Sequence, residues 1–355
     1  NTRFASNMGT FYYSSAAYQD ISAIARVNVP NTHLKPEKNA SLNLGLDLSL
    51  FRNRLNVSFD YFNNKISDMI CMQPTSSIYG SAPYYANVGK MDNKGVELSV
   101  QASLVRTRDF EWIVGGNIAH YDDKITSLGG EERIINGNWI TEVGKSPYQF
   151  YGYQVVGVFS TQAEAEAANL MADNGNYFRG GDMHYVDQNG DNQINDADLI
   201  CFKKAAPDVF MGLTSQLSYK NWDFSFALRG SFGNYVYNNV QSNREAYEGA
   251  NMYDQTGFLK NRLTSARSTD FKNAQYRSSY YVQNASFVRM DNISLGYTFN
   301  KLFNDKQSAR VYATVQNPFV ITKYKGLDPE ISGEGIDNNI YPRPRVFMIG
   351  LNLNF

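Results

Sequence analysis

Apolar and polar side chains alternate strictly along the segment SLNLGLDLSLF, residues 41–51, where the leucines occupy every second position. Successive side chains of a β-strand point to opposite faces, so this period predicts a strand with one apolar and one polar face. The run 55–61 repeats the pattern directly after Arg52 and Asn53. Two alternating runs separated by so short a connection predict a β-hairpin.

Seven further runs show the same period of two, whereas a helical pattern occurs in one place. In residues 160–172, Ser160 or Thr161 would cap a short helix that is rich in Ala and Glu. The sequence therefore predicts an all-β fold with one short helix. The seven runs are 96–104, 110–124, 209–219, 222–237, 286–299, 309–316 and 345–355.

The connections between these nine runs distinguish a membrane barrel from a soluble β-sandwich, which would also alternate. Short and long connections follow each other without exception, as in outer-membrane barrels that have short periplasmic turns and long outer loops. The short connections are 52–53, 105–109, 220–221 and 300–308, and the long ones are 70–93, 125–208, 238–285 and 317–344. We therefore predict a transmembrane antiparallel β-barrel whose leucines Leu42, Leu44, Leu46 and Leu48 face lipid.

The same parity sets the domain organisation. The segment 151–159 also resembles a strand, but counting it as a crossing would break the parity, so we assign it to a large extracellular excursion, 125–208. Nine strands leave an open sheet edge, which lipid does not tolerate. We therefore expect residues 38–355 to be the C-terminal strands of a larger barrel. Residues 1–37 would supply upstream barrel strands and a loop.

Composition and motifs exclude several other classes. The formal net charge is −1, which gives no general attraction to nucleic acid. No apolar stretch is long enough for a transmembrane helix, and no hydrolase or P-loop spacing occurs. An outer-membrane enzyme would need converging Ser, His and carboxylate groups, yet only His120 is expected near the outer end of a strand. We therefore predict no catalytic site.

Seven segments, in order along nearly the whole chain, resemble the C-terminal region of the SusC/RagA family of TonB-dependent outer-membrane transporters. A typical one is NVGKMDNKGVELSV, residues 87–100, and another is VQNPFVITKYKGLDPEIS, residues 315–332. The resemblance implies a 22-stranded barrel that is filled by an N-terminal plug. The remaining segments are 34–70, 143–159, 181–196, 281–299 and 341–355.

The resemblance also implies function and partners. It suggests import of glycans or peptides across the bacterial outer membrane, powered through the TonB complex, with a SusD-like lipoprotein on the outer side. The plug, the TonB box and the early strands have no counterpart in this sequence, so we expect them upstream of Asn1. In the family a terminal aromatic residue, here Phe355, is part of the assembly signal.

The stretch YVDQNGDNQINDAD, residues 185–198, has the spacing of a calcium loop. Oxygen ligands at positions 1, 3, 5, 7, 9 and 12 suit Ca²⁺ or Mg²⁺ in a structural role. Two departures weaken the pattern, because Asn192 replaces the usual Gly and Asp198 replaces the longer Glu. The alternative is a loop folded by its own side-chain-to-backbone hydrogen bonds. The candidate ligands are Asp187, Asn189, Asp191, the carbonyl of Gln193, Asn195 and Asp198.

Two functional alternatives remain open at this stage. Trp139, Tyr148 and Tyr151 lie in the outer excursion, where they would either stack on sugar or pack structurally. A secreted glycan-binding β-domain with a dockerin-like calcium loop is the alternative to an importer. The alternation of loop lengths favours the importer.

Overall fold

The computed structural model describes most of the chain: residues 13–18, 21–26, 29–73, 84–136, 139–245, 276–300 and 307–354. The chain divides into two compact units. The first unit comprises residues 1–45, 60–96 and 121–148, and the second comprises 46–59, 97–120 and 149–355. Strands β3 to β6 contribute residues to both units, whereas every later strand of the large sheet lies within the second.

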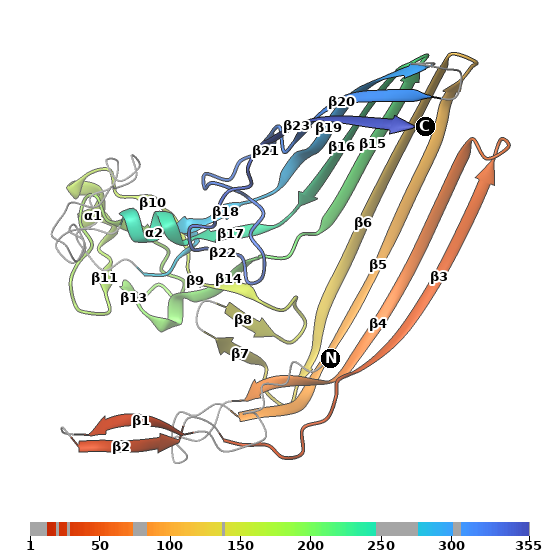
Figure 1. The fold of residues 1–355 in the computed structure, drawn as a ribbon. Helices are drawn as coiled ribbons and strands as arrows, with labels where there is room; N and C mark the ends of the chain where they lie inside the picture. Colours follow the sequence, from red (N-terminus) through yellow and green to blue (C-terminus); the bar gives the residue numbers. More distant parts are fainter. Residues whose placement is uncertain are drawn as a thin grey trace. The chain divides into compact units, whose positions relative to one another are not determined.

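The nine predicted runs form consecutive neighbours of one large sheet, in the order β3-β4-β5-β6-β15-β16-β19-β20-β23 (Figure 1). All pairs from β6 to β23 are antiparallel. A tenth strand, β21, pairs with β19 beside this path. The bounds are β3 Lys38–Leu50, β4 Leu55–Gln73, β5 Tyr84–Arg106, β6 Phe110–Leu128, β15 Val209–Tyr219, β16 Trp222–Phe232, β19 Phe287–Asn300, β20 Ser308–Gln316, β21 Val320–Thr322 and β23 Val346–Asn354.

Two of the short connections are tight turns of the kind that hairpins require. Between β3 and β4, Phe51, Arg52 and Asn53 all have φ between 53° and 64°. Between β15 and β16, Lys220 has φ 53°. Positive φ at the turn matches the right-handed twist of the flanking strands, so these residues hold consecutive strands antiparallel.

Two strands are longer than the sequence pattern indicated. β4 contains 19 residues and β5 contains 23, so both continue past the alternating runs into residues assigned to the connection 70–93. Only 74–83 separates them, and these positions lie outside the described residues. The alternating pattern marks only the part of a strand that has one face toward lipid, and it is absent where both faces of the strand are polar.

The run 222–237 is not one strand, as predicted, but two. The chain leaves the large sheet at Gly233, which has φ 85° and whose missing Cβ would lie 2.1 Å from the Asp208 carboxylate. A side chain there would be strained and would clash. Strand β17 (Tyr235–Asn238) then forms a separate three-stranded sheet between β18 (Val282–Asn284) and β22 (Ile336–Asp337).

One helix was predicted, and two α-helices occur among the described residues. Helix α1 (Gln162–Ala168) begins after Thr161, whose side chain accepts a hydrogen bond from the Glu164 N–H, so this element is confirmed. Helix α2 (Asn239–Glu245) was missed. Its sequence, NVQSNRE, is rich in residues of weak helix propensity, so its position in the fold rather than propensity determines it. Among the described residues, no helix is long and apolar enough to span a membrane.

Residues 151–159 lie outside the large sheet, as predicted. Strand β9 (Gln149–Tyr153) belongs to a four-stranded sheet of order β14-β9-β8-β7, and β10 (Val155–Val158) pairs with β12. The main core of this region contains Phe150, Phe159, Phe178, Met183, Tyr185 and Ile194. The other short strands are β7 Arg133–Asn136, β8 Trp139–Glu142, β11 Met171–Ala172, β12 Met183–Tyr185, β13 Gln193–Ile194 and β14 Leu199–Lys204.

The N-terminal segment forms a small sheet of its own. Strands β1 (Tyr13–Tyr18) and β2 (Ile21–Arg26) pair antiparallel with each other. Two 3₁₀ turns, Asp196–Asp198 and Ser279–Tyr281, complete the described elements.

Candidate functional site

The two faces of the sheet from β6 to β23 differ in chemistry. Register places apolar side chains side by side on one face across six strands. On the other face, the Arg310 Nε donates to Asp223 at 2.9 Å and the Thr314 hydroxyl donates to Ser294 at 2.8 Å. Two of the apolar rows are Leu351–Val311–Tyr297–Trp222–Tyr219–Phe110 and Ile349–Ala313–Leu295–Phe224–Leu217–Trp112.

Aromatic rings gather at the end of the apolar face nearest the short turns. Phe110 lies 6.4 Å from Tyr219 between ring centroids, and Trp222 lies 4.8 Å from Tyr297. The Trp222 side chain is half exposed. Such a belt is typical of the membrane–water interface, where a ring can be wetted at one edge and apolar at the other. The apolar face is thus the lipid-facing wall, and the polar face is the inner face.

The inner face carries two arginines that are direct cross-strand neighbours, Arg229 on β16 and Arg289 on β19. Like charges in this position repel. Partial compensation comes from Asp291, which is the extra residue of a β-bulge in β19 and accepts a 2.7 Å bond from the Arg229 Nε. The sheet alone therefore leaves an excess of positive charge here.

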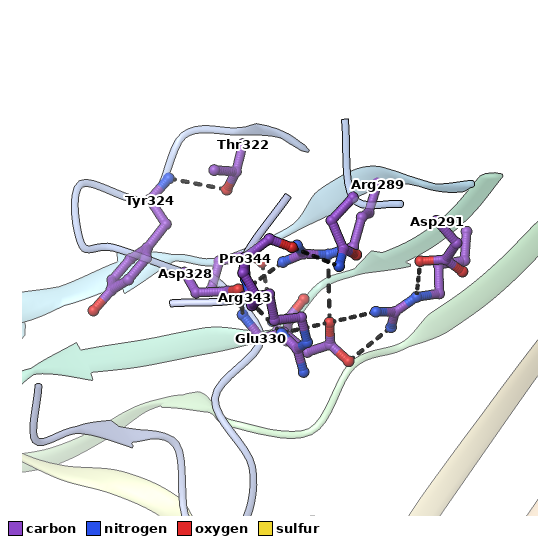
Figure 2. A network of polar contacts seen from close by, with 12 residues as sticks. Arg289, Asp291, Thr322, Tyr324, Asp328, Glu330, Arg343 and Pro344 are labelled. Atoms are coloured by element: carbon purple, nitrogen blue, oxygen red, sulfur yellow. Dashed lines mark hydrogen bonds and ion pairs between the residues drawn. The ribbon is translucent and has the colours of Figure 1, made fainter. Parts of the chain in front are cut away.

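The loop between β21 and β22 supplies the missing negative charge (Figure 2). Glu330 accepts both terminal nitrogens of Arg229 at 2.7 Å, a bidentate geometry. Asp328 accepts the Arg289 Nη2 at 2.6 Å and the Nη1 of Arg343 at 3.1 Å. Three arginines and three carboxylates thus form one neutral network. We call it the ionic clamp: Arg229, Arg289, Asp291, Asp328, Glu330 and Arg343.

Within the clamp, the Arg289 and Asp328 side chains are each only 4% exposed. Burial raises the pKa of the Asp328 carboxyl. The Glu330 N–H and the guanidiniums of Arg289 and Arg343 outweigh that effect, so the pKa lies below its usual range. Asp328 therefore stays ionised at neutral pH.

A cavity of about 510 Å³ lies beside the clamp on the inner face. The Asn117 and Arg229 side chains border it from the sheet, with Gly212 between them in the same cross-strand row. A Cβ at Gly212 would lie 2.3 Å from the Asn117 Oδ1, so a larger residue there would displace the Asn117 side chain. From the loop, the cavity is lined by Pro329, Glu330, Ile331 and Gly333.

The six candidate metal ligands lie together in one loop of the excursion, and the side chains of that loop hold its backbone. Asp187 accepts the N–H groups of Gly190 and Asn192, both at 2.7 Å. Asp198, which is fully buried, accepts those of Gln188 at 2.7 Å and Asn195 at 2.9 Å. Burial raises the Asp187 pKa, but the backbone bonds from Asn192 and Gly190 more than reverse the shift and lower it.

These bonds are those expected of a self-folded loop, in which backbone N–H groups already use the carboxylate oxygens of Asp187 and Asp198. Asn192 adopts φ 62°, so Asn takes the left-handed position that Gly would fill. Across the described ranges, no group of three or more His, Cys, Asp and Glu side chains is arranged to hold a metal. A metal here would thus depend on the Asn side chains and the Gln193 carbonyl as well, and its binding stays a prediction.

The candidate sugar-stacking residues have different environments. Tyr148 is 54% exposed, with φ 53°, and Trp139 at the start of β8 is partly buried. Tyr151 in β9 is only 6% exposed among the described residues. Their role in binding stays a prediction. Phe355 lies outside the described residues.

Sequence reasoning did not single out the clamp or the cavity. The available signal was the presence of Arg229 and Arg289 within strands expected to cross a membrane, where charged residues face the interior and mark functional positions. Their partners lie far away in the sequence, since Glu330 is 101 residues from Arg229 and Asp328 is 39 residues from Arg289, and no local pattern connects them.

A sheet with a lipid-facing apolar face, an aromatic belt and a polar inner face is the wall of a transmembrane β-barrel. Residues 3–230 match the family described as "TonB dependent receptor-like, beta-barrel". The chain belongs to this family and is SusC/RagA-like, which assigns it to the outer membrane and to a receptor rather than an enzyme. This assignment replaces the alternative of a secreted β-domain.

Individual relatives agree along the chain. TonB-dependent receptor SusC of Bacteroides thetaiotaomicron is 35% identical over 98% of this chain and 34% of its own length. TonB-dependent receptor P3 of Formosa agariphila is 29% identical over 97% of this chain and 36% of its own. The chain thus spans about a third of these relatives.

Solved structures show the same fold. The RagAB peptide importer in its closed-closed state superposes with a TM-score of 0.77 at 23% identity, covering 98% of this chain and 39% of that one. Its open-open state gives 0.77 at 22% identity, covering 100% of this chain and 38% of that one. The fold is therefore that of the C-terminal part of a TonB-dependent receptor barrel.

Proposed function

We propose that this chain is the C-terminal barrel segment of a TonB-dependent outer-membrane importer of glycans or peptides. It works with a SusD-like surface lipoprotein, and energy reaches it from the TonB complex through a region outside this chain. The segment supplies wall and outer surface. A gate and its trigger would belong to the remaining two thirds of the receptor, so this chain alone does not transport.

The observation that supports the proposal is the continuous sheet from β3 to β23, in which short turns and long connections alternate. Long connections on one side give a broad polar surface with aromatic side chains, which suits docking of a lipoprotein lid. The match to a peptide importer supports a peptide as cargo, and the 35% identity to SusC supports a receptor of the same type.

The proposal is tested in the full-length receptor by deletions within 125–208 and within 238–285. We expect each deletion to reduce recovery of a tagged lid lipoprotein and uptake of the cargo, while the barrel still assembles through its C-terminal strand. A deletion that shortens only the turn 107–109 serves as the control, because it changes the opposite edge. Unchanged lid recovery and unchanged uptake in both loop deletions would assign these functions to the rest of the receptor.

We also propose a structural Ca²⁺ or Mg²⁺ at the loop 187–198, with Asp187, Asp191 and Asp198 supplying the charge. The ligand spacing within this one loop supports it. A stacking role for Trp139, Tyr148 and Tyr151 on cargo is proposed with less structural support, since Tyr151 is buried among described residues. Substitution of the exposed Tyr148 by Ala, with Tyr177 as an equally exposed control, tests this through cargo affinity.

A further inference from the structure

The part of the β21–β22 loop that lines the cavity, residues 326–334, is fixed at both of its ends. On one side, the buried Tyr324 donates through its N–H to Thr322 at 3.1 Å and through its hydroxyl to Asp337. On the other side, β22 pairs with β17, opposite Tyr237. Both anchors are independent of the ionic clamp.

Between these anchors, charged contacts dominate the attachment to the sheet. Asp328 and Glu330 reach the two cross-strand arginines, and Ile331 adds an apolar contact to a small core that contains Tyr324. The sheet offers two arginines and one aspartate, whereas this segment offers two carboxylates. Charge complementarity therefore holds the segment against the inner wall.

The backbone beside the clamp is suited to a hinge. Gly333 and Gly335 have φ 75° and 74°, and nothing lies within 4 Å of where a Cβ of Gly333 would be. Gly335, by contrast, is packed closely, since its Cβ would lie 2.5 Å from Ala205. The unhindered Gly333 thus lies two residues before the packed Gly335, where a movable segment would meet its anchor.

From this arrangement we infer that residues 326–334 are a flap that forms the loop side of the cavity on the inner wall and that the ionic clamp holds the flap against the sheet. When the clamp is broken, the flap swings away between its two anchors and the cavity widens. Glu330 is the central closing residue, because it takes both terminal nitrogens of Arg229 and also contacts Arg343 at 3.0 Å.

The ionic nature of the clamp supports a conformational role. Buried ion pairs contribute little net stability compared with apolar packing, but removal of one partner is costly because the other charge is left unpaired. The clamp therefore opens only where water or another charged group replaces the lost partners. A purely structural attachment of this loop would need only apolar contacts such as that of Ile331.

The test uses the full-length receptor with Ser231→Cys, at a buried position of the cavity wall, as the reporter. The rate of alkylation by a small maleimide is measured, and the rate for the receptor without the introduced cysteine is subtracted as background. The double variant Asp328→Asn/Glu330→Gln removes both carboxylates of the flap with little change in shape. The control Glu334→Gln removes one carboxylate from an exposed position of the same segment outside the clamp.

We expect alkylation to accelerate by about tenfold or more in the double variant, because two charge-assisted attachments are lost, and to stay within about twofold in the control. Hydrogen exchange should accelerate in 326–334 but not in β21 or β22. If the double variant does not assemble, the single variant Glu330→Gln is used with the same readouts. Equal alkylation in variant and wild type, or faster exchange that includes both anchors, would overturn the flap.

Discussion

The wall strands β15 to β23 and the core of the excursion, 149–204, use the same apolar residue types in opposite ways. Phe347 and Ile349 on the wall are 75% and 85% exposed, whereas Phe159 and Ile194 in the excursion are 1% and 0% exposed. The wall obtains its apolar contacts from lipid, while the excursion packs its apolar side chains against each other. Burial within the chain is thus a guide to stability only in the excursion.

The difference also explains how the two regions are encoded. A wall strand must repeat apolar and polar positions for its whole crossing, because lipid covers one face uniformly. The excursion instead encloses a small core with strands of two to six residues, so its buried positions follow no period. The aromatic cluster of Tyr153, Tyr185 and Tyr276 shows this, since it joins rings from distant segments.

The contrast in burial between the excursion and the wall is tested most directly by truncating one large side chain in each region. Phe159→Ala should destabilise the excursion by about 3–5 kcal/mol, because it leaves a cavity in a closed core. Phe347→Ala on the wall should cost much less, because lipid fills the space. Hydrogen exchange and limited proteolysis of the full receptor in a bilayer would measure both.

The expected pattern is local. Protection should fall in β10 and β12, which surround Phe159, and stay unchanged in β20 and β23. Similar losses from the two substitutions would mean that the wall packs against protein at Phe347 rather than against lipid.

A charge introduced into the wall tests which face of the strand contacts lipid. Ile349→Arg should destabilise the assembled barrel by about 2–4 kcal/mol, because a cation at the lipid face is poorly solvated. Thr314→Arg on the neighbouring strand is the matched control and should cost little, since its side chain faces the polar inner side and its cross-strand partners, Met348 and Ser294, are uncharged. Folding into vesicles under a urea gradient provides the measurement, and equal penalties would show that the assignment of faces is wrong.

The sequence predicts the wall far better than the site. Nine strands, their order and the helix after Thr161 follow from period, turn chemistry and capping, which are local properties. The break at Gly233 was missed because its cause, the Asp208 carboxylate, is a tertiary neighbour. The clamp was missed for the same reason: Arg229 and Glu330 are adjacent only after the sheet has formed.

The polar side of the wall responds to acid, unlike either apolar region. The pKa of Asp328 is depressed in the folded state, so its stabilising contribution is fully present above the unfolded value near 3.9 and is lost as pH falls through the lower folded value. We expect a loss of about 1.5–3 kcal/mol in the attachment of 326–334, the scale of one charge-assisted hydrogen bond. Hydrogen exchange of this segment at pH 5, where Asp328 is ionised, is compared with exchange below pH 3, where Asp328 becomes protonated.

Protection of this loop should be unchanged between pH 7 and 5, because Asp328 stays ionised throughout that range. Asp328→Asn is the control, since it should show weak attachment at every pH. Loss of protection already above pH 5 would point to another titrating group.

The smallest expected effect concerns the loop 187–198, and it would stabilise only the excursion. If Ca²⁺ binds only the folded loop, a free concentration of ten times its Kd raises the free energy of unfolding by about 1.4 kcal/mol. The carboxylates of Asp187 and Asp198 already accept four backbone N–H bonds, so the metal would find its ligands largely in place. We therefore expect slower hydrogen exchange in 185–198 with calcium than with a chelator, and no change in β15 to β23.

Two variants separate the ligand set from the other acids of the loop. Asp191→Asn should weaken the calcium effect, whereas Asp196→Asn, at an exposed position outside the ligand set, should leave it intact. Calorimetry on the full receptor measures binding directly, and the absence of heat at millimolar calcium would leave the side-chain-to-backbone bonds as the whole explanation of the loop.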